Sequence, residues 1–429
     1  MNSFVFLGFM HSVRPLIPIL TAAGILLGGN GLQGTLIALR GAQEGFSPAT
    51  IGFMGTAYFA GFLLGCLFIQ RMMRSVGYIR SFSALAAIAA SATLVMAIAI
   101  DATVWSAMRF LSGFCFAGLF TIMEAWLNSG VTNKDRARVL AIYRVVDLGA
   151  VTGSQFLIPL IGPEGFPIFA AMAIMITLSL VPVSLGDRSN PTTPEDVKLD
   201  LRRAWEISPI AAIGCIAIGL TNSAFRTLSP VYAQDIGMSV ADVATFVSVS
   251  IIGGAFIQYP LGYASDRYDR RIILMVTSSL AMATALALGF LAGSDPLLNF
   301  VLVFVFGAFA LPLYSLSAAH ANDRAEKHEY VMLNAALMLF YSIGAIVGPF
   351  AAAAAMQWYG PHSLWLFSVA VYFVFIVLIL LRMRARPPAP EHERARFTAL
   401  LRTSTIFARL AHRPASKRRD DKDTGEAER

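Results

Sequence analysis

Long apolar segments alternate with short polar ones along most of this 429-residue chain. A helix needs about 20 mainly apolar residues to cross about 30 Å of membrane hydrocarbon. The segments that meet this requirement are predicted to be membrane helices. There are twelve, near residues 15–39, 48–69, 81–100, 104–128, 138–160, 166–185, 208–232, 240–264, 272–292, 297–319, 330–355 and 363–381. The pattern therefore predicts an all-α membrane protein.

The loops between these segments differ sharply in charge. Alternate threading places the loops near 40–47, 101–103, 161–167, 233–239, 293–297 and 357–361 on one side, where Arg40 is the only basic residue. The other side carries Arg71, Arg74, Arg80, Lys134, Arg136, Arg138, Arg202, Arg203, Arg267, Arg270, Arg271, Arg324, Lys327 and a basic tail. By the positive-inside rule, that side and both termini are cytoplasmic. We therefore expect a multi-pass protein of the cell inner membrane.

The polar loop between the sixth and seventh segments divides the chain into two halves. We expect a bundle over residues 1–185, a cytoplasmic loop over 186–207, a second bundle over 208–384 and a cytoplasmic tail over 385–429. The halves resemble each other, because LGAVTGSQ in the fifth segment parallels IGAIVGPF in the eleventh, each with Gly-x-x-x-Gly. Parallel repeats of this kind are typical of transporters that rock around a central site.

Composition narrows the function further. Apolar residues make up 56% of the chain and charged residues 14%, against about 25% charged in a soluble domain. Topology accounts for the net charge of +7, so no nucleic-acid partner is expected. The three cysteines, Cys66, Cys115 and Cys215, stand singly in apolar segments, so neither a metal site nor a disulfide is expected. No phosphate-binding glycine loop and no nucleophile–base pair occurs, so we expect neither direct use of ATP, nor a cofactor, nor an enzyme.

Three ionisable residues lie at similar depth in the fourth and fifth segments. Arg144 and Asp147 are three residues apart and share a helix face, and Glu124 could pair with Arg144 if the two helices are neighbours. Charges inside a membrane are functional by default, so this cluster could exchange a proton or meet a charged substrate. The alternative is a fixed salt-bridge network that only fastens two helices.

Other polar residues lie in the first and seventh segments. Arg226 follows Asn222 by one turn, and it could bind a carboxylate or phosphate or could pair with Asp147. Asn30 and Gln33 place amides at mid-depth, where bonding to substrate and bonding between helices are equally plausible. His320, at the inner end of the tenth segment, is expected only to cap its helix.

Several motifs resemble those of the major facilitator superfamily. GYASDRYDRR, from Gly262, is similar to its cytoplasmic loop motif, with Asp269 where the second Gly is usual. RFLSGFCFAG, from Arg109, is similar to its fourth-helix motif. Together with MEAWLNSG, QYPLGYASDR, LPLYSLS and YSIGAIVGP, these resemble the YcaD-type bacterial permeases. Two departures are Arg74, where the first-half loop motif has Asp, and Ser154, where the antiporter motif has Pro.

The resemblance implies two pseudo-symmetric six-helix bundles, with the third, sixth, ninth and twelfth helices facing lipid. Those four segments contain no Asn, Gln or charged residue. It also places Arg109 in a central cavity, although an Arg so near the outer surface could instead snorkel. It assigns a cytoplasmic gate to the loop after the eighth helix, where simple topogenic charge is the alternative. The gate residues would be Asp266, Arg267, Arg270 and Arg271.

The implied function is secondary transport of a small solute by alternating access, coupled to protons and performed by a monomer. Export of drugs or metabolites and uptake of a small anionic solute both remain open, as does a non-transporting sensor or scaffold of the same fold. In the tail, Arg396–Arg413 has an amphipathic pattern that suits a helix lying on the anionic inner leaflet of the bilayer.

Overall fold

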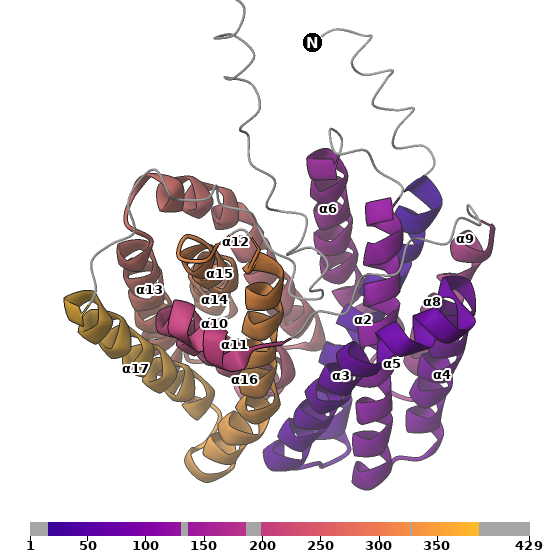
Figure 1. Cartoon of the computed structure of the whole chain (residues 1–429). Coiled ribbons are helices and arrows are strands. Elements are labelled where there is room, and N and C mark those ends of the chain that lie inside the picture. The colour runs from indigo at the N-terminus through magenta and orange to yellow at the C-terminus, as the bar shows by residue number, and fades with distance from the viewer. Residues whose placement is uncertain (1–15, 130–135, 186–198, 327, 386–429) are drawn as a thin grey trace, which may run out of the picture.

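The computed structural model describes residues 16–129, 136–185, 199–326 and 328–385, and within these ranges every regular element is a helix (Figure 1). The amphipathic tail segment lies outside them. The helices are α2 (Ile17–Gln43), α3 (Pro48–Val76), α4 (Tyr78–Ile98), α5 (Ala102–Ser129), α6 (Arg136–Gln155), α7 (Leu157–Ile161), α8 (Pro167–Leu178), α9 (Leu180–Leu185), α10 (Leu201–Ile207), α11 (Pro209–Asp235), α12 (Val240–Arg267), α13 (Arg270–Phe290), α14 (Pro296–Ala310), α15 (Leu313–Asn322), α16 (Tyr330–Tyr359) and α17 (Ser363–Ala385). They form 12 spans long and apolar enough to cross a membrane, which confirms the predicted helices.

Three of the spans consist of two helices each. The breaks fall at Phe156 between α6 and α7, at Ser179 between α8 and α9, and at Leu311–Pro312 between α14 and α15. Pro312 explains the last break, because proline lacks the N–H that a continuous helix would need and its ring clashes with the preceding turn. The other nine spans are single helices.

The two bundles repeat the same helix contacts. In the first bundle α3 packs on α5, α2 on α6 and α4 on α8, and in the second α12 packs on α14, α11 on α16 and α13 on α17. Glycines make the first of these contacts close in both bundles. A Cβ atom on Gly61 or Gly113 would overlap backbone carbonyl oxygens across the α3–α5 contact, and one on Gly253 or Gly307 would do so across α12–α14. The predicted pseudo-symmetry of the two bundles is therefore present in their packing.

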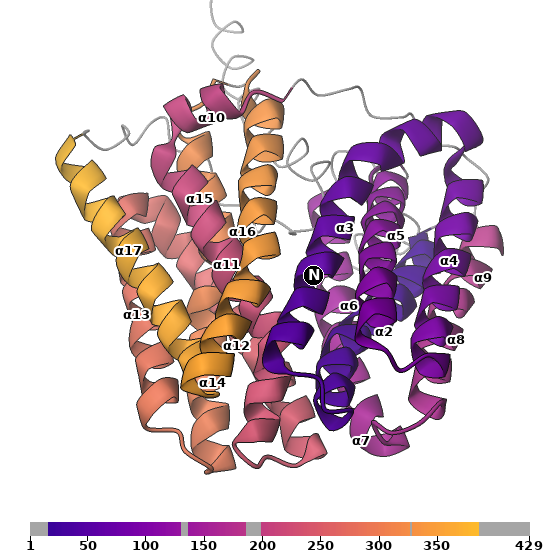
Figure 2. The same cartoon turned by 90° about the horizontal axis from the view of Figure 1, so that it is seen from below.

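The two ends of the molecule differ in charge and in how the bundles meet. We call the end with the loops near Arg80, Arg267 and Arg324 the basic end, and the other the opposite end. In Figure 2 the bundles diverge toward the basic end, where α10 lies, and approach each other at the opposite end. There α3 packs against α16, with Gly52 and Gly55 against Pro349, and the Thr56 hydroxyl donates to the Ile346 carbonyl at 2.6 Å.

The helix of the central loop, α10, is attached to the second bundle. Its Arg203 Nε donates to Glu329 Oε1 at 2.8 Å, just before α16 begins, and the Trp205 ring lies 6.4 Å from that of Phe340. Burial opposes ionisation of Glu329, but the Glu326 N–H and the Arg203 guanidinium outweigh it and hold the pKa of this carboxyl below its usual value. The salt bridge fixes one end of the loop that joins the bundles.

Candidate transport cavity

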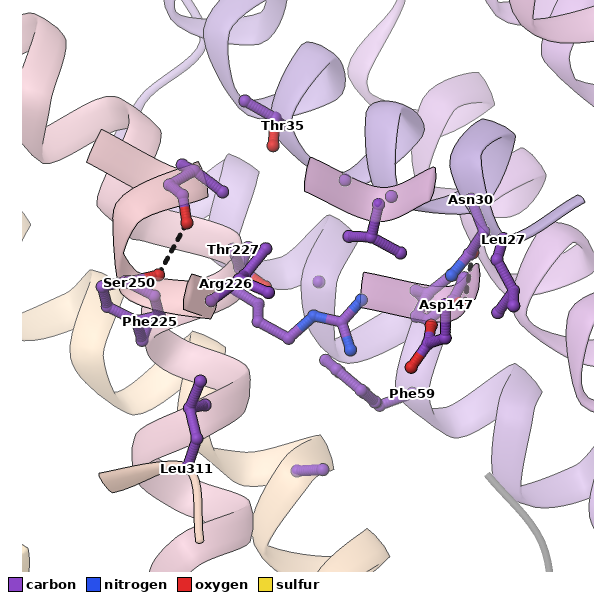
Figure 3. A pocket seen from close by; sticks show the side chains of 18 of the residues that line it. Leu27, Asn30, Thr35, Phe59, Asp147, Phe225, Arg226, Thr227, Ser250 and Leu311 are labelled. Atoms are coloured by element: carbon purple, nitrogen blue, oxygen red, sulfur yellow. Dashed lines mark hydrogen bonds between the residues drawn. The ribbon is translucent and has the colours of Figure 1, made fainter. Parts of the chain in front are cut away.

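A cavity of about 230 Å³ lies between the two bundles (Figure 3). The first bundle lines it with α2, α3, α5 and α6, and the second with α11, α12, α15, α16 and Leu311. None of the described lining residues comes from α4, α8, α9, α13 or α17. These five helices make up the third, sixth, ninth and twelfth spans, so the prediction that those spans lie away from the cavity is confirmed.

The charges of the lining are predominantly positive. Among the described residues, Arg109, Arg144, Arg226 and Asp147 are the only lining residues with a charged side chain, which gives a formal charge of +2. Most of the remaining lining is apolar or aromatic, including Phe59, Phe62, Phe120, Phe225 and Tyr341. Because such walls screen charge poorly, the cavity should attract an anion.

Arg109 points inward and is held by neutral groups. One of its guanidinium nitrogens donates to Gln33 Oε1 at 2.8 Å, and its Cζ lies 4.3 Å from the centre of the Tyr58 ring. Gln33 in turn donates to Thr93 Oγ1 at 3.1 Å. The side chain of Arg109 is only 7% exposed, which argues against snorkelling. Gln33 therefore acts in the described structure as a bond between helices that orients Arg109, and it does not line the cavity.

Asn30 and Tyr58 form the polar part of the wall beside Arg109. The Tyr58 hydroxyl donates to Asn30 Oδ1 at 2.8 Å, and both residues line the cavity. Tyr58 was not expected from the sequence, because its partner Asn30 and the Arg109 side chain over its ring lie on other helices. The available signal was its hydroxyl, in a span with few other polar side chains.

On α6, Arg144 and Asp147 form an ion pair at 2.9 Å, as their spacing of three residues predicts. Both line the cavity. Glu124 is fully buried on α5 and is not among the lining residues, but it and Asp147 both interact electrostatically with Tyr143. A direct pair between Glu124 and Arg144 stays a prediction.

Arg226 enters the cavity from α11, and Figure 3 shows it extending toward the helices of the first bundle that carry Asp147 and Asn30. Its side chain is exposed to the cavity. Within the described ranges no carboxylate lies within 4.0 Å of its guanidinium and no hydrogen bond to it is formed, so it is not paired with Asp147 in this conformation. Asn222, one turn away, is 2% exposed and lies outside the lining.

The four residues expected at the gate make contacts within the second bundle. Arg270 is 2% exposed, and it pairs with Asp266 at 3.3 Å and, through Nε, with Asp323 at 2.7 Å. Arg267 instead stacks on Tyr263, with its Cζ 4.2 Å from the ring centre. Asp323, just after α15, is a partner that the sequence did not reveal, because 53 positions separate it from Arg270.

Arg271 forms its own pair at the start of α13. It contacts Asp269 at 2.7 Å, and Asp269 also accepts from the Arg271 N–H. Burial raises the pKa of Asp269, but the bonds to Arg271 lower it by more. The pKa of this carboxyl therefore lies below its usual value. The departure from the loop motif at Asp269 therefore supplies a cap for α13.

Comparison with known proteins agrees with this architecture. The curated relatives include the uncharacterized MFS-type transporter YcaD of Salmonella newport (strain SL254) and that of Salmonella typhi, each 27% identical over 367 residues that cover 84% of this chain and 94% of the relative. Among solved structures, the nucleoside transporter NupG is 13% identical with a TM-score of 0.72, covering 88% of this chain and 100% of that one. A D-xylose-proton symporter is 13% identical with a TM-score of 0.66, covering 88% and 98%.

The match to a family description extends over nearly the whole chain. The Major Facilitator Superfamily matches residues 19–298 and 211–418. Together these ranges include the 12 spans except for the first two residues of the first one. The chain belongs to the Major Facilitator Superfamily.

Proposed function

We propose that this secondary transporter takes up a small anionic solute together with protons by alternating access. The observation that carries the proposal is the cavity between the bundles, with a formal charge of +2 and with Arg226 lacking a carboxylate partner among the described residues. An unpaired charge at membrane depth is costly, and it is retained where it meets a ligand or another charge.

Asp147 gives a physical route to proton coupling. Its carboxylate neutralises Arg144 and opposes any anion that approaches the arginines. Protonation would remove this competition, so a proton and an anion would each favour binding of the other. Mutually favourable binding produces co-transport in one direction, which favours uptake over proton-driven export.

The conformation supports an inward-facing state. The bundles meet at the opposite end through α3 and α16, and they diverge toward the basic end. With the basic end cytoplasmic, as the positive-inside rule predicts, the cavity would face the cytoplasm. The chain would then release solute in the inward-facing conformation described here and bind it in the outward-facing conformation.

The first experiment identifies the solute and tests its charge. Purified protein is screened by thermal unfolding against carboxylates, phosphate esters and neutral compounds of matched size, because a ligand that binds the folded form raises the melting temperature. We expect hits among the anions. Hits confined to neutral or cationic compounds would contradict the proposal, and they would favour export of drugs or metabolites instead.

Proton coupling is then tested with Asp147→Asn in proteoliposomes, with Glu124→Gln in parallel. Asparagine resembles protonated aspartate, so we expect exchange of solute across the membrane to persist while accumulation driven by a pH gradient is lost. Asp101→Asn, in an exposed loop at the opposite end, is the matched control. Unchanged accumulation in both variants would leave Glu124 on α5 and Asp147 on α6 a purely structural role. Binding without any exchange would favour a sensor.

A further inference from the structure

The transport cavity receives two guanidinium groups from opposite bundles. Arg109 enters from α5 and Arg226 from α11, and neither forms an ion pair with a carboxylate among the described residues. The two groups interact electrostatically with each other and with Tyr58, which also lines the cavity. Like charges repel, and apolar surroundings screen that repulsion poorly. An anionic group between the two arginines would remove the repulsion and connect the bundles.

The uncharged polar groups of the lining are few and largely engaged. Its described amides are Asn30, Gln155 and Gln258. Asn30 accepts a hydrogen bond from Tyr58, and Gln155 donates one to a carbonyl of its own helix. The hydroxyls of Ser250 and Ser342 also donate to carbonyls of their own helices. A solute rich in hydroxyl groups, such as a sugar, would therefore leave many of its own polar groups without partners, which is costly.

The rest of the lining is suited to an apolar body. Phe59, Val247 and Ile251 line the cavity and are only partly buried, so they present apolar surface to it. In Figure 3 the Arg226 side chain extends toward Phe59 and Asp147. The cavity volume of about 230 Å³ is more than ten times the roughly 10–15 Å³ that one water needs, so a compact inorganic anion would fill little of it. A larger anion would gain binding free energy by burying its apolar part here.

We propose that the solute is an amphipathic organic anion. Its carboxylate or phosphate group lies between Arg109 and Arg226, and its body, at least as large as a benzene ring, packs against the apolar lining that includes Phe59. This inference rests on the proposed function and adds the chemistry of the body and the way the anionic group is held. Carboxylate and phosphate groups both offer several oxygens, so either can accept from the two arginines at once. Because these arginines belong to different bundles, the bound anion stabilises conformations in which the bundles approach each other around it.

Matched ligands test the body and the anionic group separately, through thermal unfolding of the purified full-length protein. Phenylpropionate and phenyl phosphate are the amphipathic anions, lactate and glycerol phosphate are their hydrophilic counterparts, and phenylpropionamide is the neutral analogue. We expect at least one amphipathic anion to raise the melting temperature at a concentration about tenfold below that required of its hydrophilic counterpart, as burial of a ring predicts. The pair that responds identifies the anionic group. The neutral amide should give no shift.

Two phenylalanine variants test where the body lies. Phe59→Ala should weaken binding of the amphipathic anion about tenfold, because it removes a ring from the cavity lining. Phe59→Leu keeps an apolar side chain and should retain much of the binding. Phe53→Ala is the matched control and should leave binding unchanged, because Phe53 lies on the same helix but outside the lining.

Two arginine variants test how the anionic group is held. Arg109→Gln and Arg226→Gln should each weaken binding of the amphipathic anion about tenfold, as expected for loss of a charged hydrogen bond. Arg202→Gln, with a 91% exposed side chain, controls for the loss of positive charge. A loss of affinity in only one of the two cavity variants would show that the anion contacts one bundle alone, which contradicts the proposed bridge.

The outcomes distinguish failure of this inference from failure of the proposed function. Equal or stronger stabilisation by the hydrophilic anion of both pairs would overturn the inference and leave anion transport intact. Equal stabilisation by the neutral amide would overturn the proposed function, and no stabilisation by any of the anions would contradict both. Equal binding by Phe59→Ala and Phe53→Ala would show that the body does not pack against this lining. The ligand comparison uses only the wild-type protein, so it remains decisive even if the variants fail to fold.

Discussion

At the scale of single residues, Arg226 distinguishes a binding site from a structural network. A structural charge is paired, and its removal destabilises the fold by leaving its partner buried and alone. Arg226 has no carboxylate within 4.0 Å among the described residues, so Arg226→Gln should leave the apparent melting temperature of the empty protein unchanged or higher. It should weaken binding of the anion found by screening about tenfold, as expected for loss of a charged hydrogen bond.

Two comparisons complete this test. Arg226→Lys keeps the charge but lacks the planar fork of guanidinium nitrogens. Its affinity for the anion should therefore fall between those of the wild type and Arg226→Gln. Arg202→Gln controls for loss of an exposed positive charge. A melting temperature several degrees lower in Arg226→Gln would show that the guanidinium stabilises the fold through another contact, and the binding role would then be wrong.

Sequence reasoning succeeded at this scale where partners are close along the chain. The spacing of Arg144 and Asp147 is enough to predict their pairing, because residues three apart share a helix face. It failed for Tyr58 under Arg109 and for Asp323 beside Arg270, since these contacts join different helices. Hydropathy locates each helix but contains no information about its rotation or its neighbours.

At the scale of helices, glycines permit the α3–α5 contact. A methyl group on Gly61 would overlap the Phe110 carbonyl oxygen, so the two backbones would have to separate. Gly61→Ala should therefore lower the apparent melting temperature, at a cost of about 1–3 kcal/mol typical of overpacking. Gly149→Ala is the matched control, because nothing lies within 4 Å of its added methyl, and there alanine should stabilise the helix. Equal melting temperatures for the two variants would contradict the tight crossing.

The attachment of α10 gives a second prediction at this scale. The pKa of Glu329 is lowered in the fold, so the attachment is fully present above the ordinary carboxyl pKa and is lost as the pH falls through the lowered value. At neutral pH, Glu329→Gln should mimic that loss and expose the bond after Arg203 to trypsin. Glu326→Gln, whose carboxylate is 74% exposed, is the control. Equal cleavage rates would show that Trp205 and Phe340 hold α10 without the salt bridge.

At the scale of the whole molecule, the prediction concerns closure at the opposite end. Gly52 and Gly55 allow α3 to meet Pro349 of α16, and Gly55 also contacts Thr227. Twelve spans could be predicted from hydropathy, and the pairing of bundles from the repeat. The end at which the bundles close could not be predicted from the sequence, because closure depends on the small free-energy difference between two packings of the same helices.

Gly55→Trp should prevent this closure and favour the outward-facing state. The side chain would occupy the space of Thr227 and Pro349, so the cavity should open at the opposite end while transport is lost. A cysteine introduced at Val247, in the cavity lining, of a variant lacking the native cysteines reports the change. In sealed right-side-out vesicles an impermeant thiol reagent should label it faster than in the parent protein. Gly149→Trp, outside the lining, should leave labelling of this cysteine unchanged. Slower or equal labelling in Gly55→Trp, compared with the parent protein, would mean that the opposite end is not the closed one.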